Sequence, residues 1–115
     1  MKKFQLTTLL LALTVTSCVS LEELAPPVDE TFLLQSGASI NEVPELKQGR
    51  NLYTARCGSC HSLDKVNAYS YPEWQRIMDV EEMAAKSKFS TSETNAVLSY
   101  LKKAILVADK RSEAL

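Results

Sequence analysis

The side chains with the clearest chemical potential in this sequence lie within five residues, in the segment Cys57-Gly58-Ser59-Cys60-His61. Two thiols stand three residues apart, and an imidazole directly follows the second thiol. His61 is the only histidine of the 115-residue chain, so zinc proteases with two histidine ligands and other centres with paired imidazoles are excluded. The chemistry of this segment therefore depends on two neighbouring thiols and one imidazole.

Covalent attachment of a c-type haem is the chemistry that this spacing favours. The two sulfurs can reach the two vinyl-derived carbons on one edge of the porphyrin, and the turn between them directs His61 towards the iron. Two other interpretations stay open. Cys57 and Cys60 could form a thioredoxin-like dithiol, although that fold needs a buried strand where this chain has a polar, helix-periodic approach. A zinc site would need a fourth protein ligand and a second Cys/His cluster, which the chain does not offer.

Three helices are expected to position the motif. Pro44 suits the first turn of a helix that continues to about Cys57, and Pro72 opens a second helix. The third begins with the capping-box pattern Ser90-Thr91-Ser92-Glu93. Its apolar residues then recur at helical spacing, at Val97, Leu98, Leu101, Ala104, Ile105 and Ala108. No segment alternates convincingly like a strand, so the sequence predicts an all-α fold.

Apolar residues also share faces in the first two helices. One face of the first helix carries Leu46, Gly49 and Tyr53. One side of the second carries Trp74, Ile77 and Met78. The three expected helices form a small globular head. A domain this small forms only a marginal core by itself. A buried haem would supply the apolar surface that such a core lacks.

The sequence resembles the small class I, cytochrome c-like mono-haem domains in several segments that occur in the expected order. Besides the haem motif, these segments are Gly49-Arg50-Asn51-Leu52-Tyr53, Tyr71-Pro72-Glu73-Trp74, Met83 to Phe89 and Ala96 to Leu101. The likeness covers about residues 44–107. It implies three main helices around one covalently attached haem c. It also implies that the first and last helices cross near Gly49, with Tyr53, Tyr100 and Leu101 packed at the crossing.

The resemblance further implies a ligand on each face of the haem iron. His61 is the expected proximal ligand, beside the attachment sites Cys57 and Cys60. Class I domains usually supply a methionine sulfur on the opposite face. Met83 is the expected distal ligand, and Met78 is the alternative. An iron with water or no group in the sixth position stays open.

Aromatic residues between the histidine and methionine segments could donate hydrogen bonds to the haem propionates, as they often do in related domains. The candidates are Trp74, Tyr69 and Tyr71, of which Trp74 is the best. A buried hydrophobic anchor is the other role that each of these residues could have.

The first 17 residues have the layout of an export signal, with Lys2 and Lys3 ahead of an apolar run over residues 4–15. A run of that length is too short to cross a bilayer as a helix. The stretch Val15-Thr16-Ser17-Cys18 resembles the lipobox of bacterial lipoproteins. This resemblance implies cleavage before Cys18 and lipidation of its thiol, and an ordinary signal peptide is the alternative.

The remaining chain divides into three parts. Residues 18–41 contain Pro26-Pro27, several acidic residues and no sustained apolar period. We therefore expect an irregular, flexible tether there, from which the apolar segment 32–34 could dock on the head. Residues 42–108 form the expected haem domain, and residues 109–115 form a C-terminal tail.

Together these patterns predict a membrane-anchored electron-transfer protein on the periplasmic side of a bacterial membrane, which exchanges single electrons with redox partner proteins. Thirteen Lys and Arg against 14 Asp and Glu leave no basic excess for nucleic acid. No general base, nucleophile or carboxylate pair accompanies the motif, so we expect neither enzyme activity nor a small-molecule substrate. Two alternatives remain: a five-coordinate haem sensor or haem subunit of a larger complex, and a tethered dithiol–disulfide oxidoreductase using Cys57 and Cys60.

Overall fold

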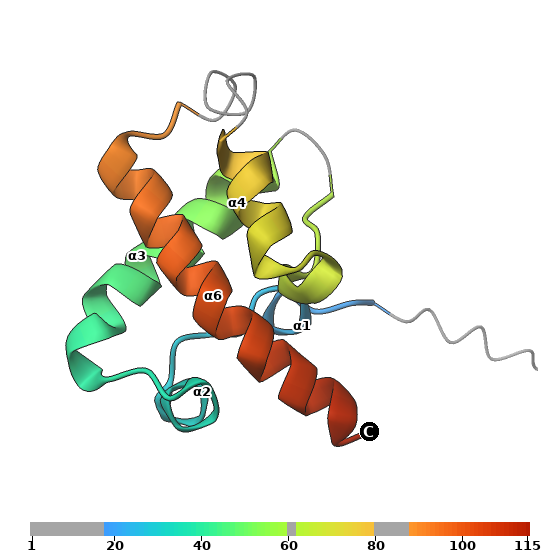
Figure 1. Cartoon of the computed structure of the whole chain (residues 1–115). Helices are drawn as coiled ribbons and strands as arrows, with labels where there is room; N and C mark the ends of the chain where they lie inside the picture. Colours follow the sequence, from blue (N-terminus) through green and yellow to red (C-terminus); the bar gives the residue numbers. More distant parts are fainter. Residues whose placement is uncertain (1–17, 60–61, 80–87) are drawn as a thin grey trace, which may run out of the picture.

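The structure is a computed structural model that describes residues 18–59, 62–79 and 88–115. These residues form helices and loops, with no strand among them, which confirms the predicted all-α class (Figure 1). The α-helices are α1 (Leu21–Leu24), α2 (Glu30–Ser36), α3 (Val43–Leu52), α4 (Tyr71–Asp79) and α6 (Thr91–Glu113). Three short turns are η1 (Ile40–Glu42), the π-helical η2 (Tyr53–Cys57) and η3 (Val66–Ala68).

Helix α6 is the longest element and begins where the sequence predicts. The hydroxyl of Ser90 accepts a hydrogen bond from the backbone N–H of Glu93 at 3.1 Å, and the Glu93 carboxylate accepts one from the N–H of Ser90 at 3.1 Å. The prediction of a tail over residues 109–115 is wrong, because α6 continues to Glu113. Lys110 and Arg111 lie in its last turn, where positive charge favours a helix end.

Helices α3 and α6 cross at Gly49, the position expected from the sequence. A Cβ atom at Gly49 would overlap the backbone carbonyl of Ala96 and approach the Cβ of Tyr100 to 2.8 Å. Glycine is therefore the residue that permits this close approach. In Figure 1, α6 runs diagonally across the molecule and α3 passes behind it.

Tyr53 and Tyr100 form the centre of the core at this crossing. Their rings lie 6.3 Å apart, and the ring of Phe32 stacks on Tyr100 at 6.0 Å. Both phenol groups bond to backbone: Tyr100 donates to the carbonyl of Pro26 at 2.9 Å, and Tyr53 donates to the carbonyl of Asp64. The apolar faces predicted for the three helices contribute to this core.

The segment 18–41 differs from the irregular tether that the sequence predicts. It contains α1 and α2, and α2 packs against α6. The carboxylate of Asp29 caps α2 by accepting from the N–H of Phe32 at 2.8 Å, and Gly37 ends the helix in the left-handed conformation. Phe32 is fully buried, so the proposed docking of residues 32–34 is confirmed for this side chain, whereas Leu34 is exposed.

Candidate functional site

Six of the candidate site residues singled out in the sequence lie within the described parts of the chain: Cys18, Cys57, Tyr69, Tyr71, Trp74 and Met78. Cys60, His61 and Met83 lie outside the described residues. The geometry of the site is therefore built from Cys57 and from the elements that surround it.

Cys57 is the last residue of η2, which continues α3 as a π-helical turn. The hydroxyl of Thr54 donates to the carbonyls of Arg50 at 3.0 Å and Asn51 at 3.2 Å within this turn. Such π-helical turns are rare and occur frequently at functional sites. Because Tyr53 and Cys57 are four residues apart, they lie on the same side of the turn.

That side of η2 forms one wall of a cavity of about 240 Å³. This volume corresponds to roughly eight water molecules at ~30 Å³ each. Three aromatic residues, three aliphatic or thioether residues, one thiol and one acid line it: Tyr53, Tyr69, Trp74, Ile77, Met78, Leu101, Cys57 and Asp64. The lining is thus largely apolar, with a cysteine at its edge.

Trp74 forms the aromatic part of the wall together with two tyrosines. Its ring meets Tyr69 edge to face at 5.0 Å and Tyr53 edge to face at 5.7 Å. Its indole N–H donates to the carbonyl of Val66 at 2.8 Å inside the protein. The single donor of Trp74 is therefore used by the backbone, which matches the role of a buried anchor and not that of a propionate donor.

The other two candidate propionate donors, Tyr69 and Tyr71, have different surroundings in the fold. Tyr69 lies on the cavity wall and is 38% exposed. The ammonium of Lys102 lies 5.7 Å from the centre of the Tyr71 ring, at the opposite helix α6. Tyr69 is therefore the residue of this group that combines a cavity position with partial access to solvent.

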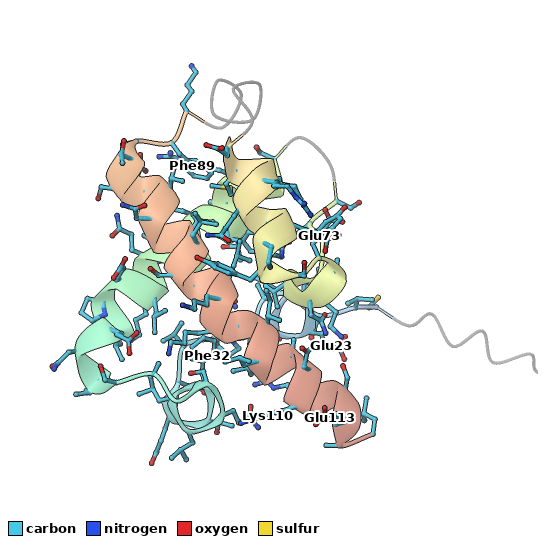
Figure 2. The ribbon with its side chains drawn as sticks, viewed as in Figure 1. Glu23, Phe32, Glu73, Phe89, Lys110 and Glu113 are labelled. Carbon is cyan, nitrogen blue, oxygen red and sulfur yellow. The ribbon has the colours of Figure 1, made fainter. Side chains whose placement is uncertain are left out.

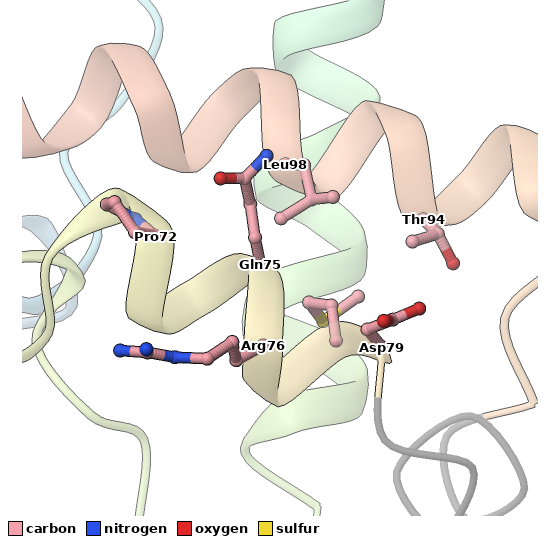
Figure 3. Close-up of a pocket in the computed structure, with 7 residues that line it drawn as sticks. Pro72, Gln75, Arg76, Asp79, Thr94 and Leu98 are labelled. Carbon is pink, nitrogen blue, oxygen red and sulfur yellow. The ribbon is translucent and has the colours of Figure 1, made fainter.

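Met78 lies on α4, one turn after Trp74, and is buried at the same cavity. It also lines a second cavity of about 530 Å³ between α4 and α6 (Figure 3). The second cavity is lined in addition by Pro72, Gln75, Arg76, Asp79, Thr94 and Leu98. Met78 thus forms part of the partition between two cavities, one of which carries Cys57.

Arg56, the residue before Cys57, joins η2 to the start of α6. Its guanidinium pairs with the carboxylate of Glu93 at 2.9 Å and donates to the carbonyl of Lys88 at 3.4 Å. It also lies 5.1 Å from the centre of the Phe89 ring. Figure 2 shows Phe89 at the entrance to α6. Arg56 therefore fixes the segment 88–93 against the turn that carries the thiol.

The electrostatics of the cavity wall keep the Tyr53 phenol neutral. Burial raises the pKa of Tyr53 well above its ordinary value, and the negative charge of Asp64 acts in the same direction. The phenol therefore remains a hydrogen-bond donor to the Asp64 carbonyl at all physiological pH values. Asp64 follows the motif by three residues, and nothing in its sequence context predicts a place at the site.

Within the described parts of the chain, no three His, Cys, Asp or Glu side chains gather as a metal site. The same residues contain no helix that is both long enough and apolar enough to cross a membrane. Cys18 is exposed and lies three positions before α1.

Comparisons of the chain with protein-family models, with curated proteins and with solved structures found no match.

Proposed function

We propose that this chain is a lipid-anchored, mono-haem c-type cytochrome that passes single electrons between redox partner proteins. The observation that carries the proposal is the position of Cys57, the first thiol of the Cys57-Gly58-Ser59-Cys60-His61 motif, on the wall of a largely apolar cavity. A thiol beside such a cavity suits the attachment of a flat apolar group. When bound, the haem iron supplies the one-electron chemistry.

The residues of the cavity fit this group in several ways. Ile77, Met78 and Leu101 offer apolar surface, and the neutral Tyr53 phenol adds no charge. The hydrogen bond from Trp74 to Val66 holds the indole as a fixed part of the wall. These side chains would lie against one part of the ring and keep water from it, because a cavity of about 240 Å³ is smaller than a whole haem.

The proposed class I, cytochrome c-like arrangement is supported by the crossing of α3 and α6. Gly49 permits the close approach of the two helices, and Tyr53 and Tyr100 meet beside it. No relative supports the assignment, so the proposal depends on the motif together with this geometry. In the proposed arrangement, Cys57 and Cys60 bind the haem c and His61 is its proximal ligand.

For the distal ligand, Met83 remains the proposal from the sequence and Met78 remains the alternative. The burial of Met78 at the same cavity as Cys57 supports Met78 as the alternative distal ligand. Methionine ligation would raise the reduction potential. We propose no catalytic residue, because outer-sphere electron transfer needs burial and ligation of the haem without an acid, base or nucleophile.

The proposed location is the periplasmic side of a bacterial membrane, where lipidated Cys18 would be the anchor. Cys18 is exposed and would be available to carry acyl chains. Two acyl chains suffice for stable attachment.

The experiment is expression of the full chain in a host that exports it and attaches haem, followed by intact mass and absorption spectra of the oxidised and reduced forms. We expect one haem per chain and a low-spin c-type spectrum with a sulfur-to-iron charge-transfer band. The matched control is Cys57→Ser with Cys60→Ser, which removes both attachment sites. A chain without haem and with a reversible dithiol would contradict the proposal and favour the oxidoreductase.

The same spectra identify the distal ligand. Met83→Ala is expected to remove the charge-transfer band and lower the reduction potential, whereas Met78→Ala should preserve the band. The opposite pattern would assign the ligand to Met78. If the wild-type protein lacks the charge-transfer band and its reduced haem binds carbon monoxide readily, the result would favour the haem sensor over the electron carrier.

A further inference from the structure

The connection between Cys18 and the folded part of the chain is very short. Only Val19 and Ser20 separate Cys18 from the first residue of α1. The span from Cys18 to Leu21 is three residues, which reach at most about 10 Å when fully extended. An anchor at Cys18 would therefore hold α1 close to the surface to which the acyl chains bind.

The capping box of α1 shortens the free connection further. The hydroxyl of Ser20 accepts from the N–H of Glu23 at 3.3 Å, and the N–H of Ser20 donates to the Glu23 carboxylate at 3.3 Å. These reciprocal bonds fix the backbone at Ser20 to the first turn of α1. Val19 is then the only residue between the thiol and a capped helix.

The chain beyond α1 is bound to the head. Arg50 of α3 donates to the carbonyl of Ala25 at 3.0 Å, and Tyr100 of α6 donates to the carbonyl of Pro26 at 2.9 Å. Ala25 is fully buried, and Phe32 fills the core below it. Residues 25–36 thus belong to the same packed unit as α3 and α6.

Two of the exposed residues beside Cys18 are large and apolar. Val19 is 61% exposed and Leu21 is 48% exposed. The acidic residues Glu22 and Glu23 follow directly in the first turn of α1. Apolar side chains next to an anchor can enter the boundary between headgroups and acyl chains, whereas two carboxylates disfavour a strongly anionic membrane.

We propose that Val19 and Leu21 form a docking surface for the lipid bilayer, which holds the folded head directly against the membrane without an intervening tether. The proposal rests on the proposed lipidation of Cys18. The expected bilayer has a low negative charge, because the carboxylates of Glu22 and Glu23 lie beside the apolar pair. The head then has one preferred orientation, with α1 towards the lipid.

The test uses the acylated, haem-loaded full chain in phosphatidylcholine vesicles, with a nitroxide attached at Leu21→Cys. Acylation occupies the thiol of Cys18 and haem attachment occupies Cys57 and Cys60, so the introduced cysteine is the one available for labelling. We expect the label to collide more with oxygen, which concentrates in lipid, than with a water-soluble nickel complex. Leu34→Cys is the matched control, because Leu34 is 78% exposed on α2, and its label should show the opposite preference.

A second variant, with a 12-residue Gly-Ser insertion between Cys18 and Val19, serves as the reference for a head that is joined to its anchor by a flexible linker. The label at position 21 should lose its lipid contact in that chain. The label at position 21 could be equally exposed to water with and without the insertion, in protein that carries the acyl mass and floats with vesicles. That result would overturn the docking proposal and leave the proposed anchor intact. Equal lipid contact at positions 21 and 34 would overturn the assignment to α1. Protein without acyl mass would overturn the proposed anchor and the docking proposal together, while a c-type spectrum would leave the proposed cytochrome intact.

Discussion

Replacing the hydrogen of Gly49 by a methyl group would place that methyl inside the backbone carbonyl of Ala96. The carbonyl belongs to α6 and cannot rotate away as the end of a flexible side chain could. The methyl would also press on the Cβ of Tyr100, at the centre of the core. One carbon atom at this position therefore forces α3 and α6 apart.

We expect Gly49→Ala to destabilise the protein by about 3 kcal/mol, at the upper end of overpacking costs, because the clash involves backbone. Urea unfolding of the wild type and variant measures the difference. Gly37→Ala is the matched control. Gly37 has positive φ but no neighbour within 4 Å of the added Cβ, so its cost should be only about 1 kcal/mol from backbone conformation. A larger loss at Gly37 than at Gly49 would contradict this account of the crossing.

The motif Cys57-Gly58-Ser59-Cys60-His61, which we propose attaches haem, was recognisable from the sequence because its pattern depends on residue type and spacing alone. The role of Trp74 was not, because the carbonyl of Val66 that accepts its N–H looks like any other carbonyl in a sequence. Sequence reasoning also missed Asp64 on the cavity wall. The contacts of Arg56 with Glu93 and Phe89 likewise depend on the tertiary fold.

At the scale of the elements, serine and glutamate three residues apart mark the starts of several helices. The pairs are Ser20 and Glu23, Ser39 and Glu42, Ser70 and Glu73, and Ser90 and Glu93. The hydrogen bond from the serine backbone N–H is the largest cause that lowers the pKa values of Glu42, Glu73 and Glu93. The charged form of each glutamate is thus favoured by folding.

These lowered pKa values predict loss of stability in acid. A carboxyl group whose pKa is lower in the folded state stabilises that state above its unfolded pKa of 4.5 and loses this contribution as the pH falls through the folded pKa. We expect the urea midpoint of the wild type to fall between pH 6 and about pH 3.5. Glu93→Gln should show a smaller fall, because glutamine can accept the same hydrogen bonds without titrating.

Glu113→Gln is the control for this experiment, since Glu113 is the last residue of the same helix α6. It removes one carboxyl group without affecting the capping box at Ser90. An equal effect of both substitutions on the acid response would show that helix capping is not its cause.

The three main helices could be predicted because a start signal, Pro44, Pro72 or Ser90, stands ahead of apolar residues at helical spacing in each of them. Helices α1 and α2 could not, because they contain four and seven residues. Periodicity is informative over windows of about 11–18 residues. Asp29 before α2 and Gly37 after it are good capping residues, but such residues are equally common in loops. The π-helical turn η2 likewise follows from packing and has no sequence signature.

At the scale of the whole molecule, four aromatic rings connect the N-terminal segment with the cavity that carries Cys57. Phe32 stacks on Tyr100, Tyr100 meets Tyr53, and Tyr53 meets Trp74 edge to face. The segment 18–41 therefore contributes to the same core that supports the cavity wall. Its loss would therefore weaken the support of the cavity wall.

We expect Phe32→Ala to destabilise the whole protein by about 3–5 kcal/mol, the usual cost of removing a buried phenylalanine. The expected result is one cooperative urea transition at a lower midpoint, with faster hydrogen exchange in α1 and α2. Leu34→Ala is the control and should be nearly neutral, since Leu34 is largely exposed on the same helix. Similar midpoints for both variants would mean that the segment folds independently of the head.

The hydrogen bond from Tyr100 to Pro26 joins residues 74 positions apart, and that from Lys110 to Gln35 joins residues 75 positions apart. During synthesis, the segment that contains Pro26 and Gln35 therefore emerges long before its partners on α6. Loop closure over such distances waits for almost the entire chain. In the proposed lipoprotein, the enzymes that cleave and acylate the N-terminus would therefore meet an open segment first, and α6 would lock that segment only after modification.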